Sequence, residues 1–198
     1  MTHAELATIR HRMVRTAVTA VAALALLVAA AIAGAGAASA DGPDTPPGVK
    51  AKVEALAWPV LNEGDARWEV IPVKFLLDEY GYMDVGSGTP NNVYDAAMAK
   101  AVTAYQKDND LSEAKKVGPE TWEHIRTDFG EIGPGKAPVL KTKAVQRALN
   151  EYGNELVLDG VYGSGTKNAV VAFQQDVGIG ADGWVGKITF RALICGGV

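Results

Sequence analysis

Few side chains in this sequence have the chemistry that an enzyme needs. Beyond residue 40 the chain has a single histidine, His124, and a single cysteine, Cys195. A catalytic zinc normally takes about three His, Asp, Glu or Cys ligands, and serine or cysteine nucleophiles need a histidine as base. His124 follows Glu120 and Glu123 in a helical pattern, which is typical of a solvated helix face. We therefore expect no catalytic residue, no metal site and no cofactor.

Asp159 and Asp182 are the remaining candidates for catalysis, because paired carboxylates carry out glycoside hydrolysis. Each of them is followed by glycine. Asp-Gly supplies the positive φ that a tight turn requires. A structural role in a turn is the simpler interpretation of both residues, and a cryptic hydrolase stays open as an alternative.

Cys195 cannot form an internal disulfide, because it is the only cysteine in the chain. The fold must therefore be held together by apolar packing. A small apolar residue at the end of the last helix is the simplest role for Cys195. An intermolecular disulfide or a reactive thiol stays open.

Residues 139–194 contain three short helical patterns, separated by the two Asp-Gly turns. Their apolar residues recur at helical spacing: Val145, Ala148, Leu149 and Tyr152, then Ala169, Val170, Phe173 and Val177, then Phe190, Leu193 and Ile194. The second and third patterns open with Gly163 and Gly186, and each glycine is followed by a threonine, Thr166 or Thr189. A glycine at the N-cap leaves backbone N–H groups free at the helix start.

The order of these residues resembles the peptidoglycan-binding domain of bacterial wall hydrolases. The matching positions are Leu149, Gly153, Asp159, Gly160, Tyr162, Gly163, Thr166, Ala169, Val170, Phe173, Gln174, Asp182, Gly183, Val185, Gly186, Thr189 and Leu193. The resemblance implies a small three-helix module that is not itself catalytic and that binds peptidoglycan or muropeptides.

Peptidoglycan offers sugar faces and stem peptides with free carboxylates. Helix N-termini carry partial positive charge and receive carboxylates well, so the helix starts are the first candidates for binding. The rings of Tyr162 and Trp184, which follow the two turns, are placed to lie against sugar or peptide. The candidate ligand-binding residues are Asp159, Gly160, Tyr162, Gly163, Thr166, Asp182, Gly183, Trp184, Gly186 and Thr189. Turn and cap geometry also explains these residue types, so a scaffold role stands beside the binding role.

Residues 58–126 read as a degenerate copy of the module at 139–195. Residues 75–81 (FLLDEYG) correspond to residues 147–153 (RALNEYG). Asn91 and Asn92 replace the first Asp-Gly, and Asp95 replaces the capping Gly163. Asparagine tolerates the left-handed conformation and aspartate is a good N-cap, so the turn and the helix start can survive. These changes preserve the core and alter the presumed ligand face.

Two copies of this size are expected to pack together. A module of roughly 60–70 residues buries only about 60% of its unfolded surface and is marginal alone. We expect Trp58, Trp68 or Phe129 at the seam between the copies.

Residues 1–40 have the pattern of a signal peptide. Arg10, Arg12 and Arg15 precede a run without charge, and small residues at positions 38–40 offer a cleavage site. An uncleaved membrane anchor stays open, because the uncharged run is long enough to span a bilayer. Residues 41–57 and 127–138, which are rich in proline and glycine, are expected to be linkers.

The charge of the chain narrows the class of partner. Without residues 1–40, 16 Lys+Arg stand against 22 Asp+Glu, a net charge of −6. This balance argues against nucleic acid and against long-range steering towards an anionic cell wall.

Together these features predict an exported, non-catalytic peptidoglycan-binding protein of the all-α class, with two tandem modules. We expect it outside the cell in association with the cell wall, and at a membrane only through the N-terminal segment if that is uncleaved. The alternatives are a secreted protein-interaction or inhibitory protein on the same fold and a cryptic cell-wall hydrolase.

Overall fold

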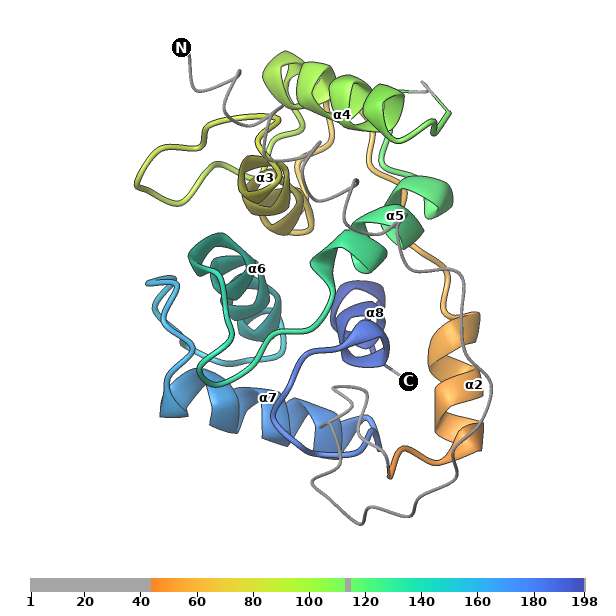
Figure 1. Cartoon of the computed structure of the whole chain (residues 1–198), viewed down its shortest axis with the longest axis vertical. Helices are drawn as coiled ribbons and strands as arrows, with labels where there is room; N and C mark the ends of the chain where they lie inside the picture. The colour runs from red at the N-terminus through yellow and green to blue at the C-terminus, as the bar shows by residue number, and fades with distance from the viewer. Residues whose placement is uncertain (1–43, 113–114, 198) are drawn as a thin grey trace, which may run out of the picture. The chain divides into compact units, whose positions relative to one another are not determined.

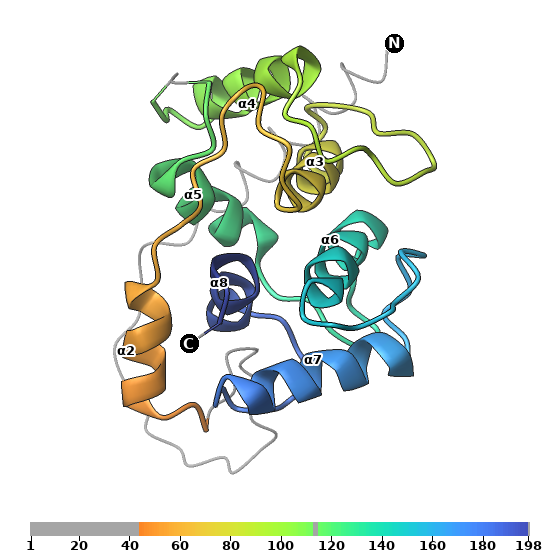
Figure 2. The ribbon, with the colours of Figure 1, turned by 180° about the vertical axis from the view of Figure 1, so that it is seen from behind.

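All regular elements that the structure describes are α-helices. The structure is a computed structural model and describes residues 44–112 and 115–197, so the expected signal segment lies outside the described residues. The helices are α2 (Pro47–Ala55), α3 (Val70–Glu79), α4 (Ala96–Asp108), α5 (Pro119–Phe129), α6 (Val139–Asn150), α7 (Ser164–Asp176) and α8 (Lys187–Cys195) (Figures 1 and 2). This confirms the predicted all-α class. In the described ranges, no helix has the length and apolar character needed to cross a membrane.

Two sets of three helices follow the same order. Helices α3, α4 and α5 form the first copy, and α6, α7 and α8 form the second copy. The predicted helix starts are confirmed: α5, α7 and α8 begin after Gly118, Gly163 and Gly186. Helix α4 begins after Asp95, whose side chain accepts a hydrogen bond from the Met98 amide. The turn chemistry in the sequence therefore sets where the helices begin.

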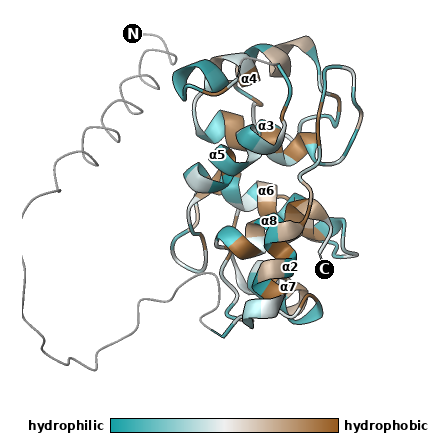
Figure 3. Ribbon diagram, turned by 90° about the vertical axis from the view of Figure 1, so that its right-hand side faces the viewer, coloured by the Kyte–Doolittle hydropathy of each residue, from teal (hydrophilic) through white to brown (hydrophobic). Residues whose placement is uncertain are grey.

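Each copy buries the apolar faces of its helices. Polar and apolar stretches alternate along the ribbon, as Figure 3 shows. The largest fully buried side chains are Trp122, Tyr94, Tyr105, Phe75, Phe129, Leu61, Leu76, Leu77, Met98, Ile125, Ile132 and Leu149. Burial of each such side chain contributes about 1.5–3 kcal/mol, which is what a fold without disulfides depends on.

A short backbone bridge closes each copy in the same way. Leu61 pairs with Val117 in the first copy, and Ile132 pairs with Val185 in the second. In both copies, a segment that precedes the first helix is thereby joined to the loop that precedes the third. Ile132 is fully buried, so part of the segment at 127–138 belongs to the core of the second copy.

Corresponding helices of the two copies pack against each other. Helix α3 lies against α6, and α5 lies against α8 (Figure 1). The ring centroids of Phe129 and Phe190 are 4.6 Å apart, and those of Trp58 and Phe190 are 6.3 Å apart. The Arg147 guanidinium lies 5.8 Å from the Trp68 ring. All three aromatic residues expected at the seam are therefore found there.

Helix α2 precedes the first copy in the chain but packs on the second. It contacts α8, and Val49 would lie 3.6 Å from a side chain placed at Gly178. Just before α2, the Thr45 hydroxyl accepts a hydrogen bond from the Gly180 amide at 2.9 Å. The two copies are thus joined by their seam and also by this N-terminal helix.

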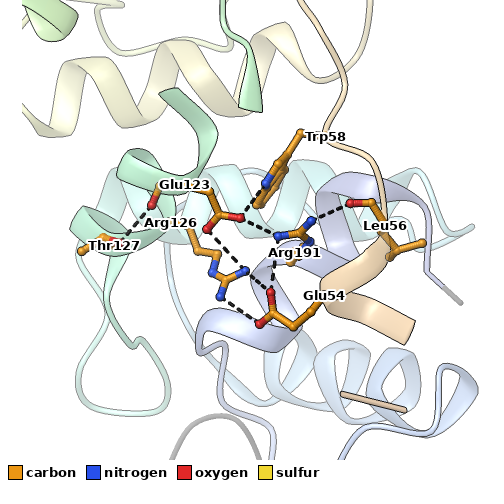
Figure 4. A network of polar contacts seen from close by, with 7 residues as sticks. All are labelled: Glu54, Leu56, Trp58, Glu123, Arg126, Thr127 and Arg191. Carbon is orange, nitrogen blue, oxygen red and sulfur yellow. Dashed lines mark hydrogen bonds and ion pairs between the residues drawn. The ribbon is translucent and has the colours of Figure 1, made fainter. Parts of the chain in front are cut away.

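A polar network connects α2, α5 and α8 (Figure 4). Arg191, which is 8% exposed, pairs with Glu54 and Glu123 and donates to the Leu56 carbonyl at 2.6 Å. Its guanidinium also lies 4.8 Å from the Trp58 ring, a cation–π distance. Arg126 on α5 is the second arginine of the network. It donates hydrogen bonds from both of its terminal nitrogens to Glu54, each at 2.9 Å. Its hydrogen bond is the main reason that the pKa of Glu54 lies below its usual value.

Replacing Arg191 with methionine is expected to lower the free energy of unfolding by about 2–3 kcal/mol. The substitution keeps an unbranched apolar stem but removes the guanidinium, which leaves both carboxylates and the Leu56 carbonyl without this donor. Because Glu54 and Glu123 are partly exposed, the loss should stay below that of a fully buried ion pair. Urea denaturation measures it.

The control is Lys187→Met, an exposed position in the first turn of the same helix. This change should stay within about 0.5 kcal/mol of the wild type. Equal effects of the two substitutions would show that the network does not stabilise the fold.

Candidate functional site

A buried glutamine holds the first Asp-Gly turn. The side-chain amide nitrogen of Gln146 donates to Asp159 Oδ1 at 2.8 Å and to the Val161 carbonyl at 3.3 Å. Its carbonyl oxygen accepts a hydrogen bond from the Gly160 amide at 3.0 Å. The Gln146 side chain on α6 therefore pairs with the Gly160 amide, which is a donor of the turn, and with two of its acceptors, Asp159 Oδ1 and the Val161 carbonyl.

Gln174 on α7 holds the second turn in the same manner. Its side-chain nitrogen donates to Asp182 Oδ1 at 3.0 Å and to the Trp184 carbonyl at 2.8 Å, while its oxygen accepts from the Gly183 amide at 2.9 Å. The sequence pattern indicates that Gln174 faces a neighbouring loop, and the structure confirms it. The matching role of Gln146 was missed, although this residue also lies on the core-facing side of its helix.

The two threonines of the predicted site point inwards. Thr166 and Thr189 are 3% and 0% exposed, and their hydroxyls accept hydrogen bonds from Gln146 and Gln174 at 3.2 and 3.1 Å. They belong to the same clamps as the turns. Any contact with a ligand at this face must come from other groups.

Asp159 and Asp182 also have internal partners. Each carboxylate accepts a hydrogen bond from the backbone N–H two residues later, Val161 or Trp184, at 2.8 Å. The hydrogen bond from Gln146 is the largest cause of the lowered pKa of Asp159. A general acid needs a raised pKa, and the pKa of Asp159 is shifted in the opposite direction.

The two aromatic candidates are both half-buried. The Tyr162 hydroxyl donates to the Gly183 carbonyl at 3.0 Å and so links the first turn to the second. The Trp184 ring lies directly over Gly133, where an added Cβ would approach the ring to 2.3 Å. Each ring therefore combines a packing contact with some exposed surface.

The two predicted helix starts differ in access. Gly163 is exposed, together with the next two residues, Ser164 and Gly165, whereas Gly186 is buried. No side chain caps α7, so the first backbone N–H groups of α7 face the solvent side of Gly163. We call Gly163, Ser164 and Gly165 the α7 start. Of these two helix starts, it is the one that an external carboxylate can reach.

Apolar side chains surround the α7 start. Val161 is largely exposed, and its Cγ1 would lie 3.9 Å from a Cβ at Gly163. Leu156 Cδ2 would lie 4.0 Å from a Cβ added at Gly165. Val139 lies against Gly160 in the first turn. The face thus combines hydrogen-bond donors with an apolar rim.

The first copy keeps these devices in altered form. Gln106 donates to the Lys116 carbonyl and to Thr121, both at 2.8 Å, as Gln174 does to its counterparts. Lys115 stands at the position of Gly183 and has the positive φ of 53° that the turn requires. Asn91 accepts from the Val93 amide as Asp159 does from Val161, but Asn92 does not adopt a positive φ.

Lys74 of α3 occupies the position that Gln146 has in the second copy, and its side chain reaches the start of α4. Its ammonium donates to Asn91 and to Asp95, each at 2.9 Å. A carboxylate of the chain is therefore bound at the first-copy position that corresponds to the α7 start.

His124 is not the solvated residue that the sequence suggests. Its Nδ1 lies 2.8 Å from the Tyr105 hydroxyl oxygen. That hydroxyl donates its hydrogen bond to Asp128 at 2.7 Å. Burial is the main cause of the strongly raised pKa of Tyr105. Within the described ranges, no three His, Cys, Asp or Glu residues are grouped so that they could hold a metal ion.

The seam between the copies has a hollow that is too small for a ligand. Pro72, Ala148 and Phe190 are among its lining residues, and its volume is about 10 Å³. A space of this size holds about one water molecule. The exposed face at the α7 start is therefore the better candidate for binding.

The comparisons with known proteins point to one family. A family model described as a putative peptidoglycan binding domain matches residues 69–125 and 141–193. The chain is 27% identical over 152 residues to the N-acetylmuramoyl-L-alanine amidase CwlM of Mycobacterium tuberculosis. That alignment covers 67% of this chain and 37% of CwlM. No solved structure matches the chain.

Replacing Gln174 with leucine is expected to lower the free energy of unfolding by about 3 kcal/mol. Leucine fills a similar volume but leaves the Gly183 amide and the Trp184 carbonyl buried without this partner. The neighbouring exposed Gln175→Leu is the matched control and should change stability by less than about 0.5 kcal/mol. Similar losses for both variants, measured by urea denaturation, would contradict the role of the clamp.

Cys195 is expected to react slowly with an aromatic disulfide reagent in the folded protein. Burial raises the pKa of this thiol to about 12, so little thiolate is present at pH 8. Unfolding in urea should speed the reaction by at least about 100-fold, because the pKa then returns to its ordinary value. Equal rates with and without urea would show that the thiol is accessible in the fold.

Proposed function

Because the chain belongs to the peptidoglycan-binding domain family, we propose that it binds peptidoglycan and that the second copy carries the binding face. The observation that carries this proposal is the α7 start, an exposed helix N-terminus that no side chain caps. A stem-peptide carboxylate docks on the backbone N–H groups there, where the helix dipole favours negative charge. Peptidoglycan supplies such carboxylates at fixed positions along its peptides.

The surroundings of the α7 start suit the rest of such a ligand. Val161, Leu156 and the exposed part of the Tyr162 ring offer apolar surface to sugar rings and peptide side chains. The buried clamps of the two turns keep this surface rigid, so little conformational entropy is lost on binding. Of the ten residues that the sequence marks as candidates, the proposal assigns ligand contacts to Gly163, Tyr162 and Trp184 and gives the other seven the role of holding the face in shape.

The charges of the two copies favour the second copy as the binder of an anionic polymer. Residues 58–126 carry 12 acidic and seven basic side chains, whereas residues 139–195 carry five acidic and six basic side chains. An anionic wall is repelled less by a neutral module than by an acidic one. Short-range contacts can then decide the binding.

The proposed protein is a binder that is exported to the cell wall. Export rests on the arginines and the uncharged run in residues 1–40 of the sequence. The amidase CwlM is a relative over 37% of its own length, so its printed activity is not carried over to this chain. The acids nearest to the α7 start have structural hydrogen bonds, which favours binding without hydrolysis.

Replacing Gly163 with aspartate is expected to abolish wall binding while keeping or raising stability. The backbone at Gly163 is extended, with φ −85° and ψ −170°, and an added Cβ meets nothing closer than 3.9 Å. Aspartate there caps α7 and places its own carboxylate where the ligand's would dock. Retention on purified sacculi should fall at least about tenfold, as for the loss of roughly 1.4 kcal/mol of binding free energy. Co-sedimentation measures retention, and thermal unfolding measures stability.

The control is Asn168→Asp, an exposed position one turn further along α7. It adds the same charge to the same helix without filling the cap, so retention should stay close to that of the wild type. Retention of Gly163→Asp at the wild-type level would place the ligand elsewhere. A wild-type protein that stays wholly in the supernatant would overturn the proposal of peptidoglycan binding itself.

A further inference from the structure

The start of α4 in the first copy holds a carboxylate that the chain itself supplies. Asp95 Oδ1 accepts a hydrogen bond from the Met98 amide at 2.8 Å, within the first turn of the helix. Asp95 Oδ2 accepts from the Lys74 ammonium at 2.9 Å. Two donors from two helices therefore converge on one carboxylate.

Lys74 makes this arrangement more than a common helix cap. Its side chain is 3% exposed, and a buried ammonium is stable only with an anion or several acceptors beside it. Asn91 Oδ1 accepts a second hydrogen bond from the ammonium at 2.9 Å. The Asp95 side chain, in contrast, is 40% exposed, so this carboxylate-binding position opens to the solvent.

The second copy has the same backbone without the carboxylate. Asp95 has φ −90° and ψ 172°, and Gly163 has φ −85° and ψ −170°, so both helices begin from the same extended conformation. Gln146 stands in place of Lys74 and holds the turn instead of an anion. The two copies thus differ in whether the helix start has a carboxylate of its own.

We propose that Asp95 fills, from within the chain, the carboxylate position of the first copy, so that each chain receives a ligand carboxylate at the second copy alone. The inference rests on the proposed function, because it assigns the external ligand to the α7 start. The N-cap residue, Asp95 in the first copy and Gly163 in the second, then decides whether the helix start of that copy can receive an external carboxylate. The first copy then serves as a folded support that covers α6 and α8.

The test uses the full-length protein with Asp95→Gly and sodium acetate as the probe. Glycine fits the extended backbone and leaves the Lys74 ammonium and the Met98 amide facing an unfilled space. Acetate should enter this space and stabilise the variant, as any ligand that binds the folded state does. We expect the midpoint of thermal unfolding to rise by about 2–4 °C in 0.1 M acetate at pH 7, with ionic strength held constant by chloride.

Three controls separate a specific site from a general salt effect. The wild type should respond less than Asp95→Gly, because with Asp95 in place acetate can reach only the α7 start. The double variant Lys74→Gln and Asp95→Gly should respond much less, because the buried cation is gone. Acetamide, which has the shape of acetate without its charge, should not stabilise Asp95→Gly.

Equal responses of the wild type and Asp95→Gly to acetate would overturn the proposal, and so would the lack of any response in Asp95→Gly. Where Asp95→Gly does not fold, Asp95→Ser replaces it, since the serine hydroxyl caps the helix but carries no charge. The result is independent of the sacculus assay. Loss of sacculus retention in Gly163→Asp, together with no acetate response in Asp95→Gly, rejects this inference and leaves the proposed function standing. Unchanged sacculus retention in Gly163→Asp, together with an acetate response in Asp95→Gly, rejects the α7 start as the wall site. It leaves standing the inference that Asp95 fills the carboxylate position of the first copy.

Discussion

Two buried glutamine side chains hold the second copy in the form on which its binding face depends. A tight turn that leads into a helix leaves backbone N–H and C=O groups without partners, and burying such groups costs about 1–3 kcal/mol each. The side chains of Gln146 and Gln174 supply one donor and one acceptor to each turn. This lets Gly160 and Gly183 be buried, although Asp159 and Val161 beside the first glycine are exposed. The position of the α7 start relative to the rest of the copy follows from these two amides.

The repeated sequence produces a repeated architecture that neither copy completes alone. Helix α3 packs on α6 and α5 on α8, so each copy covers an apolar face of its counterpart. Packing of equivalent elements is the arrangement of a twofold dimer, here within a single chain. The first copy contributes α3 and α5 to these contacts, and it differs from the second copy at Lys74 and Asp95, beside the start of α4.

Much of the fold follows from local signals in the sequence. Gly118, Gly163 and Gly186 begin helices because a capping glycine followed by helical spacing has few other solutions. The seam was predictable in kind, because small modules with large aromatic residues outside their own cores need further burial. These inferences use neighbours within a few residues, or the total size of a module.

The candidate site was less predictable, because it depends on which side of a residue faces solvent. Thr166 and Thr189 look like ligand contacts from their spacing, but a residue three positions into a helix points back towards the turn and its glutamine. Gly163 and Gly186 have the same sequence context, yet only the packing of the rest of the chain buries one and exposes the other. The Tyr105–His124–Asp128 cluster joins residues of two helices, and no local pattern marks such a group.

The docking of α2 on α8 has a consequence for the order in which the chain reaches its final state. A ribosome makes α2 before α8, so the surface of α8 that receives α2 does not exist until residues 187–195 have been made. Until then Glu54 has no Arg191 beside it. Helix α2 is thus made before the helix on which it packs. A nascent chain stalled before residue 187 would leave it unanchored.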